Sequence, residues 1–398
     1  MGTLRGGVAT AELAMLVLLL ATTCQATSMA TTHFDEFFPF WNVLLQETLR
    51  YNCSSELATY KTGEREPGTK YSSLITPVID CILQNMPEHR KAELGASAVV
   101  LGLLPTILST LGSTPAETAF LHLRRPVLAM LLALGSPSVA VMKTSDYKSF
   151  TANLVEQVGA RPSASTSSSR GAWTQPVLRN RVLLSITQYV LAMGAAGNVV
   201  YMCYQLGYHA IVSWTPETIF MVPLWTFICI VLHFGAVWIQ SLRISVASIG
   251  PANTTNTATP IFRSSSNLIR KLPQEHVPIA FQRHKTIRWR GDTAFVNLLI
   301  WALCIGAVVN LIFGSMISSS ILFFSVKDVL VIATRYILST LVCRGIGRLE
   351  LLGARESRQR LKGSERLSVA IQNYPGPPRV GPRPPPAGLP IGILRCRS

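Results

Sequence analysis

The stretch Ala294–Val342 decides the fold, and it reads AFVNLLIWALCIGAVVNLIFGSMISSSILFFSVKDVLVIATRYILSTLV. As a single helix it would be far longer than the hydrocarbon core of a bilayer, which is about 30 Å thick. Gly314 and the serines at 318–320 are residues that favour a turn. The stretch 294–342 therefore predicts a transmembrane hairpin of two apolar helices, Ala294–Ser315 and about Ser320–Val342.

Two more apolar stretches precede this hairpin, Val182–Gln205 and Thr218–Gln240, and they predict a second transmembrane hairpin over 182–240. Charged residues make up only 14% of the chain, whereas soluble globular proteins contain about 25%. Apolar residues make up 48% of the 398 residues. The composition excludes a large water-soluble core, and we expect an all-α, polytopic α-helical membrane protein.

The N-terminus has the pattern of a secretory signal peptide over residues 1–26. Arg5 precedes the short apolar run Leu13–Ala21, and small residues follow where a signal peptidase would cleave. An uncleaved membrane anchor is the alternative. In either case residues 27–94 would be delivered to the lumenal or extracellular side.

The segment 27–94 carries two signs of an oxidising compartment. Asn52-Cys53-Ser54 is a sequon for glycosylation at Asn52. Cys53 and Cys81 are the two cysteines of the segment, and such a pair predicts one disulfide. The alternative is that both cysteines are reduced and the sequon is unused.

Residues 95–142 contain two apolar stretches that are interrupted by proline. Gly95–Gly112 contains Pro105, and Pro126–Met142 contains Pro137. Each stretch is near the lower length limit for a spanning helix. Length alone does not decide which of them crosses the membrane, so the charge distribution must.

Positive charge is concentrated in three segments, 143–181, 241–293 and 343–398. Together they contain 25 Lys and Arg against 7 Asp and Glu, although the net charge of the whole chain is only +16. The positive-inside rule places them in the cytoplasm as a basic linker, a basic loop and a disordered, proline-rich tail. With 27–94 outside, residues 95–142 must then cross an odd number of times.

We therefore expect Pro126–Met142 to cross, with Gly95–Gly112 lying at the interface or re-entering the membrane, which gives five spans. The alternative has both stretches crossing, for six spans.

Two basic patches in these segments suggest partners. The first lies immediately before the span at Ala294, where anionic lipid could bind the basic residues Arg283, Lys285, Arg288 and Arg290. A role in topology alone is the alternative. The second is the proline-rich tail, in which Arg379, Pro382 and Pro385 have the spacing of a ligand for an SH3-type domain. No nucleic-acid-binding module surrounds either patch, so nucleic acid is not an expected partner.

The last predicted span contains three charged residues, Lys327, Asp328 and Arg335. Each would cost roughly 2.5–3.5 kcal/mol near the bilayer midplane. Asp328 and Arg335 are seven residues apart and share a helix face, so we expect direct or water-bridged pairing. Polar residues of the other spans are further candidate partners: Asn297, Asn310, Asn198, Gln188 and His233.

These residues predict a polar site inside the bundle that could pass an ion, a proton or a small solute. The alternative is structural: buried polar groups hold the helices in register while Lys327 reaches outward. Motifs for nucleophilic catalysis, zinc binding and phosphate binding are absent from the sequence. We expect neither an enzyme nor a cofactor or metal.

Several short motifs, scattered over most of the chain, resemble uncharacterised multi-span membrane proteins of filamentous fungi. They are Asn52-Cys53-Ser54, Leu101–Thr106, Arg125-Pro126 with Leu131–Pro137, Asp328, Arg335-Tyr336, Ser339, Cys343-Arg344 and Glu350-Leu351. The resemblance implies that the two proline-interrupted stretches and the helix with Asp328 and Arg335 are shared features. It supplies no activity or ligand.

The sequence thus predicts a non-enzymatic protein of the plasma membrane or endomembrane system, with a lumenal or extracellular N-terminus and a cytoplasmic C-terminus. An interaction or scaffold role is the first hypothesis. The alternative is a transporter or channel that uses the polar residues of the last span.

Overall fold

The computed structural model describes residues 33–63, 74–159, 181–247, 277–279, 286–289 and 292–372. Within these ranges the chain is almost entirely helical, and its strands form two short two-stranded sheets. The all-α fold expected from the sequence is confirmed. The expected signal peptide lies outside the described residues.

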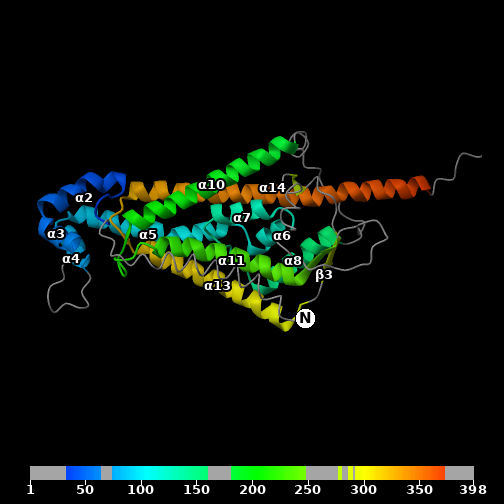
Figure 1. Ribbon diagram of the computed structural model, residues 1–398, viewed down its shortest axis with the longest axis horizontal. Coiled ribbons are helices and arrows are strands. Elements are labelled where there is room, and N and C mark those ends of the chain that lie inside the picture. The colour runs from blue at the N-terminus through cyan, green and yellow to red at the C-terminus, as the bar shows by residue number, and fades with distance from the viewer. Residues whose placement is uncertain are drawn as a thin grey trace, which may run out of the picture.

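Five long helices form a bundle along the long axis of the molecule (Figure 1). They are α5 (Glu88–Leu111), α10 (Arg181–His209), α11 (Met221–Arg243), α13 (Ala294–Ser319) and α14 (Val326–Gln372). Each contains a stretch long and apolar enough to cross a membrane. Large apolar side chains stay exposed on the outside of the bundle, as a lipid-facing surface requires. The chain is therefore a polytopic membrane protein, as predicted.

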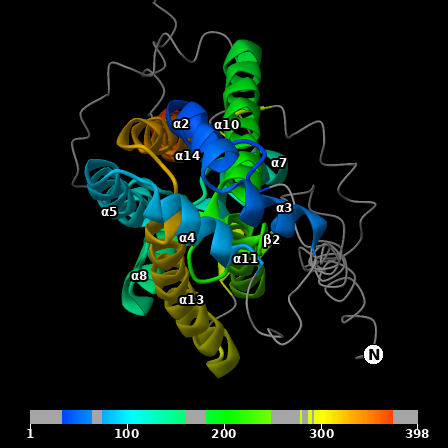
Figure 2. The ribbon, with the colours of Figure 1, turned by 90° about the vertical axis from the view of Figure 1, so that its left-hand side faces the viewer.

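Three short helices form a cap over one end of the bundle, which we call the cap end (Figures 1 and 2). They are α2 (Pro39–Tyr51), α3 (Ser54–Thr62) and α4 (Thr76–Gln84). Their apolar faces bury a cluster around Trp41, Leu45 and Ile79. The predicted disulfide between Cys53 and Cys81 is confirmed, with 5.9 Å between the two Cα atoms.

A small sheet joins the cap to the bundle. β1 (Ile211–Val212) follows α10, β4 (Ile321–Leu322) follows α13, and the two pair antiparallel with Ile211 opposite Leu322. Ile211 and Phe323 belong to the same apolar cluster as the cap helices. The cap is thus packed on the loops of the bundle and does not depend on its disulfide alone.

The opposite end, which we call the basal end, carries α6 (Pro115–His122), α8 (Thr144–Gly159) and a second sheet (Figure 1). In this sheet β2 (Ile244–Ala247) pairs antiparallel with β3 (Thr286–Trp289), with Ile244 opposite Trp289. A Thr114 capping box with Glu117 begins α6, because each side chain bonds the other residue's backbone N–H.

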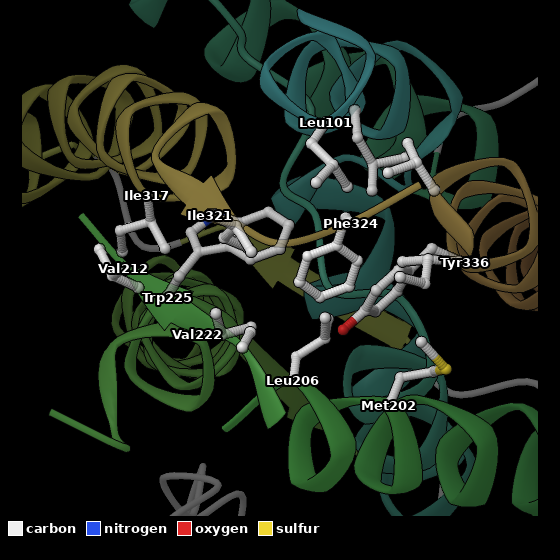
Figure 3. Packing of buried hydrophobic residues seen from close by; sticks show 14 of the residues in the cluster. Leu101, Met202, Leu206, Val212, Val222, Trp225, Ile317, Ile321, Phe324 and Tyr336 are labelled. Carbon is white, nitrogen blue, oxygen red and sulfur yellow. The ribbon is translucent and has the colours of Figure 1, made fainter. Parts of the chain in front are cut away.

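The main apolar core lies where the five long helices meet near the cap (Figure 3). The rings of Phe324 and Tyr336 lie between Leu101 of α5 and the α10 residues Met202 and Leu206 (Figure 3). All five side chains are at most 4% exposed. The core therefore joins α5, α10 and the start of α14, which are far apart in the sequence.

The turn of the last hairpin differs from the sequence prediction. α13 continues to Ser319, and α14 begins at Val326 instead of near Ser320. Gly314 lies inside α13, where a Cβ atom would clash with the Trp225 indole of α11. The glycine is needed for close contact between α11 and α13, not for a turn.

The last span also ends later than expected. The sequence placed its end at Val342 and a disordered tail over 343–398, but α14 continues to Gln372. At 1.5 Å per residue, α14 is about 70 Å long, more than twice the thickness of a bilayer core. The hydrophobic signal stops near Val342, whereas helical structure does not depend on apolar residues.

The assignment of the two proline-interrupted stretches was wrong. Glu88–Leu111 is a single helix that contains Pro105, and it is long enough to cross a membrane. The second stretch forms only a ten-residue helix, α7 (Pro126–Gly135), about 15 Å long, followed by non-helical chain over 136–143. Charge counting predicted one crossing in this region but could not tell which stretch makes it.

Candidate functional site

The short helix α7 enters the bundle from the basal end and does not cross it. Arg125, the residue that precedes its first turn, lies beside Gln188 of α10 and Glu350 of α14. The helix ends at Gly135, where a Cβ atom would meet Ala196 of α10 and Cys343 of α14. Both of these neighbours lie two helical turns further from the basal end.

The chain then returns toward the basal end. Val139 packs against Cys229 and Ala307, near the middle of α11 and α13. Further along, Thr151 of α8 bonds Arg243 at the end of α11. We call residues 126–142 the re-entrant hairpin, because they enter and leave at the same end.

The tip of this hairpin, 135–139, is completely buried by the long helices. Non-helical backbone at membrane depth is tolerated only inside protein or beside water, since lipid offers no hydrogen bonds. The His233 ring bonds the Ser138 carbonyl (3.4 Å), and Ala140 N–H bonds the Ser113 carbonyl (3.4 Å). A Cβ atom on Gly112 would clash with Ser138, so a glycine is needed where α5 ends.

A buried ion pair holds the start of the hairpin. Arg125 Nη1 lies 2.8 Å from Glu350 Oε1, and the two side chains are 0% and 2% exposed. Arg125 also donates to Gln188 (2.6 Å) and Ser185 (2.9 Å) of α10, and its guanidinium lies over the Tyr189 ring. Gln188 donates in turn to Glu350 (2.6 Å). The cluster connects α7, α10 and α14 at one point.

A second buried arginine holds the basal end. Arg243 of α11 forms two hydrogen bonds with the Asp292 carboxylate (2.8 and 3.0 Å) and donates to Thr151 (2.8 Å). Its guanidinium lies near the Tyr147 ring of α8. Burial raises the pKa of the Tyr147 phenol, and the Arg243 cation opposes that shift. Tyr147 therefore stays neutral.

Asp328 and Arg335 do not pair, contrary to the prediction. Asp328 lies in the first turn of α14, where its carboxylate accepts from Ser325 Oγ (2.7 Å) and from Phe40 N–H of α2 (3.5 Å). An aspartate in this position also interacts favourably with the helix dipole. Lys327 is exposed, with its ammonium over the Phe40 ring. Both residues join α14 to the cap, because α14 starts later than the sequence suggested.

Arg335 instead contacts α10. It donates to Asn198 Oδ1 (3.0 Å), while the Asn198 amide donates to the Arg335 carbonyl (3.1 Å) and to Ser339 (2.8 Å). The guanidinium also lies over the Tyr201 ring. Asn198 was a candidate partner from the sequence, and the structure shows that contact.

The other predicted polar residues do not join this site. Asn310 of α13 donates to Cys229 Sγ of α11 (3.0 Å), and its Oδ1 atom has no hydrogen-bond partner among the described residues. The same holds for the Oδ1 atom of Asn297, near the basal end of α13. Beside Asn310 is a cavity of about 10 Å³, lined also by Trp225, Ser109 and Ser138, which is room for about one water molecule.

The basic and proline-rich patches predicted from the sequence fall mostly outside the described residues. Arg283, Lys285, Arg290, Arg379, Pro382 and Pro385 lie outside the described residues, and Arg288 is in β3. Asn52 is exposed at the end of α2, where its amide donates to Asn85 (2.9 Å). Glycosylation at Asn52 stays a prediction.

The sequence prediction missed both buried arginine clusters. Arg243 and Asp292 were counted only in the charge of the basic segments, Arg125 entered only as part of a short motif, and Glu350 entered in both ways. Their burial depends on contacts across 225 and 49 residues of chain, which periodicity does not reveal. In the part of the chain that the structure describes, no group of His, Cys, Asp and Glu could hold a metal ion.

No protein-family model, curated protein or solved structure matches this chain. Function must therefore be argued from its own residues. The polar clusters connect helices by side-chain contacts.

Proposed function

We propose that this protein is a non-enzymatic membrane scaffold, with its cap end in the lumen or outside the cell and its basal end in the cytoplasm. The positive-inside rule supports this orientation, because the three basic segments all adjoin the basal end. The disulfide supports an oxidising environment for the cap.

The observation that carries the proposal is the continuity of α14. One helix contacts the cap through Asp328 and α10 through Arg335, and it bonds Arg125 through Glu350. It then extends to Gln372, beyond its apolar part, which ends by Ala354. We call residues 355–372 the basal arm (Figure 1). A rigid helix that links an outer cap to an inner arm suits a protein that holds partners on two sides of a membrane.

The polar clusters support a scaffold over a pathway. Arg125, Arg243 and Arg335 each bond a side chain from another helix or from the chain before one. Groups satisfied in this way fix the positions of helices and leave no free charge to bind a passing ion.

The same orientation suggests partners for the basal side. The basic residues Arg283, Lys285, Arg288 and Arg290 would contact anionic lipid beside the bundle. The proline-rich segment with Arg379, Pro382 and Pro385 begins shortly after the basal arm, which would hold an SH3-type domain away from the bilayer.

Photo-crosslinking in cells tests the scaffold role. A photoreactive residue at Leu361 or Leu367 of the basal arm should give a discrete protein crosslink. The same residue at Leu338, which is 61% exposed on the lipid-facing side of α14, is the matched control and should crosslink lipid. Absence of a protein crosslink from both arm positions would overturn the proposal.

A second candidate, transport of an ion or small solute, is favoured by the re-entrant hairpin. Irregular backbone at mid-depth often accompanies a pathway. The two hypotheses predict different results when proteoliposomes are assayed for flux of protons, K⁺ and glycerol. A scaffold gives the flux of protein-free vesicles. Flux above that level, abolished in folded Asp328→Asn or Arg335→Gln protein but retained in Lys327→Gln, would establish transport instead.

A further inference from the structure

A groove opens on the outside of the bundle between the re-entrant hairpin and α13. Its volume is about 540 Å³, which is within the range of ligand sites. One wall is formed by α13 and the other by the chain that leaves the hairpin and begins α8. The groove lining includes Lys143, Asp146, Trp301, Cys304, Ile305 and Val308.

The groove faces lipid. Trp301, Ile305 and Val308 are 57%, 41% and 40% exposed, and they continue the exposed apolar face of α13 that starts at Phe295. A tryptophan on such a face is typical of the region near lipid headgroups. The groove is therefore open to an acyl chain from the side.

Its mouth carries two opposite charges. Lys143 directly precedes α8, Asp146 lies in its first turn, and both are exposed residues of the groove lining. Neither forms an ion pair with another residue in the part of the chain that the structure describes, and the Asp146 carboxylate accepts a hydrogen bond from its neighbour Ser145 (3.3 Å). Two charges of opposite sign are thus available to a ligand.

We propose that this groove binds a phospholipid with a primary ammonium headgroup, phosphatidylethanolamine. The phosphate would lie at Lys143 and the free N–H groups that begin α8. The ammonium would donate to Asp146, and an acyl chain would lie along Ile305 and Val308. An anionic headgroup would face Asp146 unpaired, while the quaternary ammonium of phosphatidylcholine has no N–H to donate.

Native mass spectrometry of the purified full-length protein tests this site. The protein is exposed to equal amounts of phosphatidylethanolamine, phosphatidylcholine and phosphatidylglycerol. We expect a roughly two- to fivefold preference for phosphatidylethanolamine, the size expected from one partly exposed ion pair. Asp146→Asn should remove the preference over phosphatidylcholine, and Lys143→Gln should weaken retention of all three lipids.

The controls distinguish loss of lipid binding from loss of folding. Both side chains are exposed, so each variant should elute as the wild type does. Lys91→Gln alters the exposed Glu88–Lys91 pair elsewhere and should leave the preference intact. Maleimide labelling of the half-buried Cys304 in the groove wall should slow in phosphatidylethanolamine. Equal retention of the three lipids, an unchanged preference in Asp146→Asn, or unaltered Cys304 labelling would overturn the proposal.

Discussion

The Arg125 side chain is completely buried. Its guanidinium forms an ion pair with one carboxylate and donates hydrogen bonds to two neutral acceptors. The cost of removing two ions from solvent offsets much of their attraction, so a buried ion pair adds little net stability. The pair does, however, destabilise any conformation in which Arg125 and Glu350 are apart, because each charge would then be buried alone. Because Glu350 also accepts from the Ile279 N–H (2.9 Å), this one carboxylate holds both the start of α7 and Ile279 on α14.

We predict that Glu350→Leu lowers the free energy of unfolding by about 3–5 kcal/mol, because the buried Arg125 cation loses its ion pair with the Glu350 carboxylate. Arg125→Met combined with Glu350→Leu should recover most of this loss. Unfolding in mixed micelles titrated with denaturing detergent measures both values.

The exposed pair at the start of α5 provides the control for this experiment. Lys91→Gln removes its interaction with Glu88 (2.8 Å), and we expect a change below about 1 kcal/mol. If Glu350→Leu costs no more than this substitution, or if the double variant is no more stable than the single one, the cluster does not set the position of α7.

At the scale of elements, the sequence predicted well what depends on local apolarity. The four clear spans correspond to α10, α11, α13 and α14, and the cysteine pair predicted the disulfide of the cap. The predicted site at Asp328 and Arg335 failed because helix phase says which residues share a face, but not where the helix begins. Starting at Val326, α14 places Asp328 in its first turn and Arg335 against α10.

The proline-interrupted stretches failed for a different reason. Pro105 is tolerated inside α5, where it is buried, although a proline in a helix interior usually ends or kinks the helix. In the second stretch, Gly135 and Pro137 end α7 within the bundle, and surrounding helices supply the polar contacts that lipid lacks. Tertiary contacts decided both outcomes, and they are not visible in a hydrophobicity pattern.

Gly135 permits the tip of α7 to fit between α10 and α14. A Cβ atom there would lie 2.7 Å from Cys343 Sγ and 3.1 Å from the Ala196 backbone nitrogen. We therefore expect Gly135→Ala to lower the free energy of unfolding by about 1–3 kcal/mol through overpacking. The same detergent titration measures this change.

Gly197 of α10 is the matched control, since a Cβ atom there meets nothing within 4 Å. Gly197→Ala should raise stability by about 0.5–1 kcal/mol, because alanine loses less conformational entropy in a helix. Equal effects of the two substitutions would show that the re-entrant tip is not packed as described.

At the scale of the whole molecule, the re-entrant hairpin decides which parts of the chain share a side of the membrane. If α7 returns to the end where it entered, α5 alone crosses between the cap and α8. The cap and the segment 143–181 then lie on opposite sides. If both proline-interrupted stretches crossed, the cap and that basic segment would share one side, against the positive-inside rule.

The chain contains two sequons that can report this difference. Asn52 is exposed on the cap, and Asn253-Thr254-Thr255 lies between β2 and β3 in the sequence. Since only lumenal sequons meet the glycosylation machinery, we expect a glycan at Asn52 and none at Asn253. Digestion with a glycosidase should shift the wild-type protein and Asn253→Gln on a gel, but not Asn52→Gln. A sequon engineered at 163–169 should also stay unmodified. A glycan at that engineered site, or at Asn253, would place the basic segments outside and require an even number of crossings before α8 or an inverted bundle.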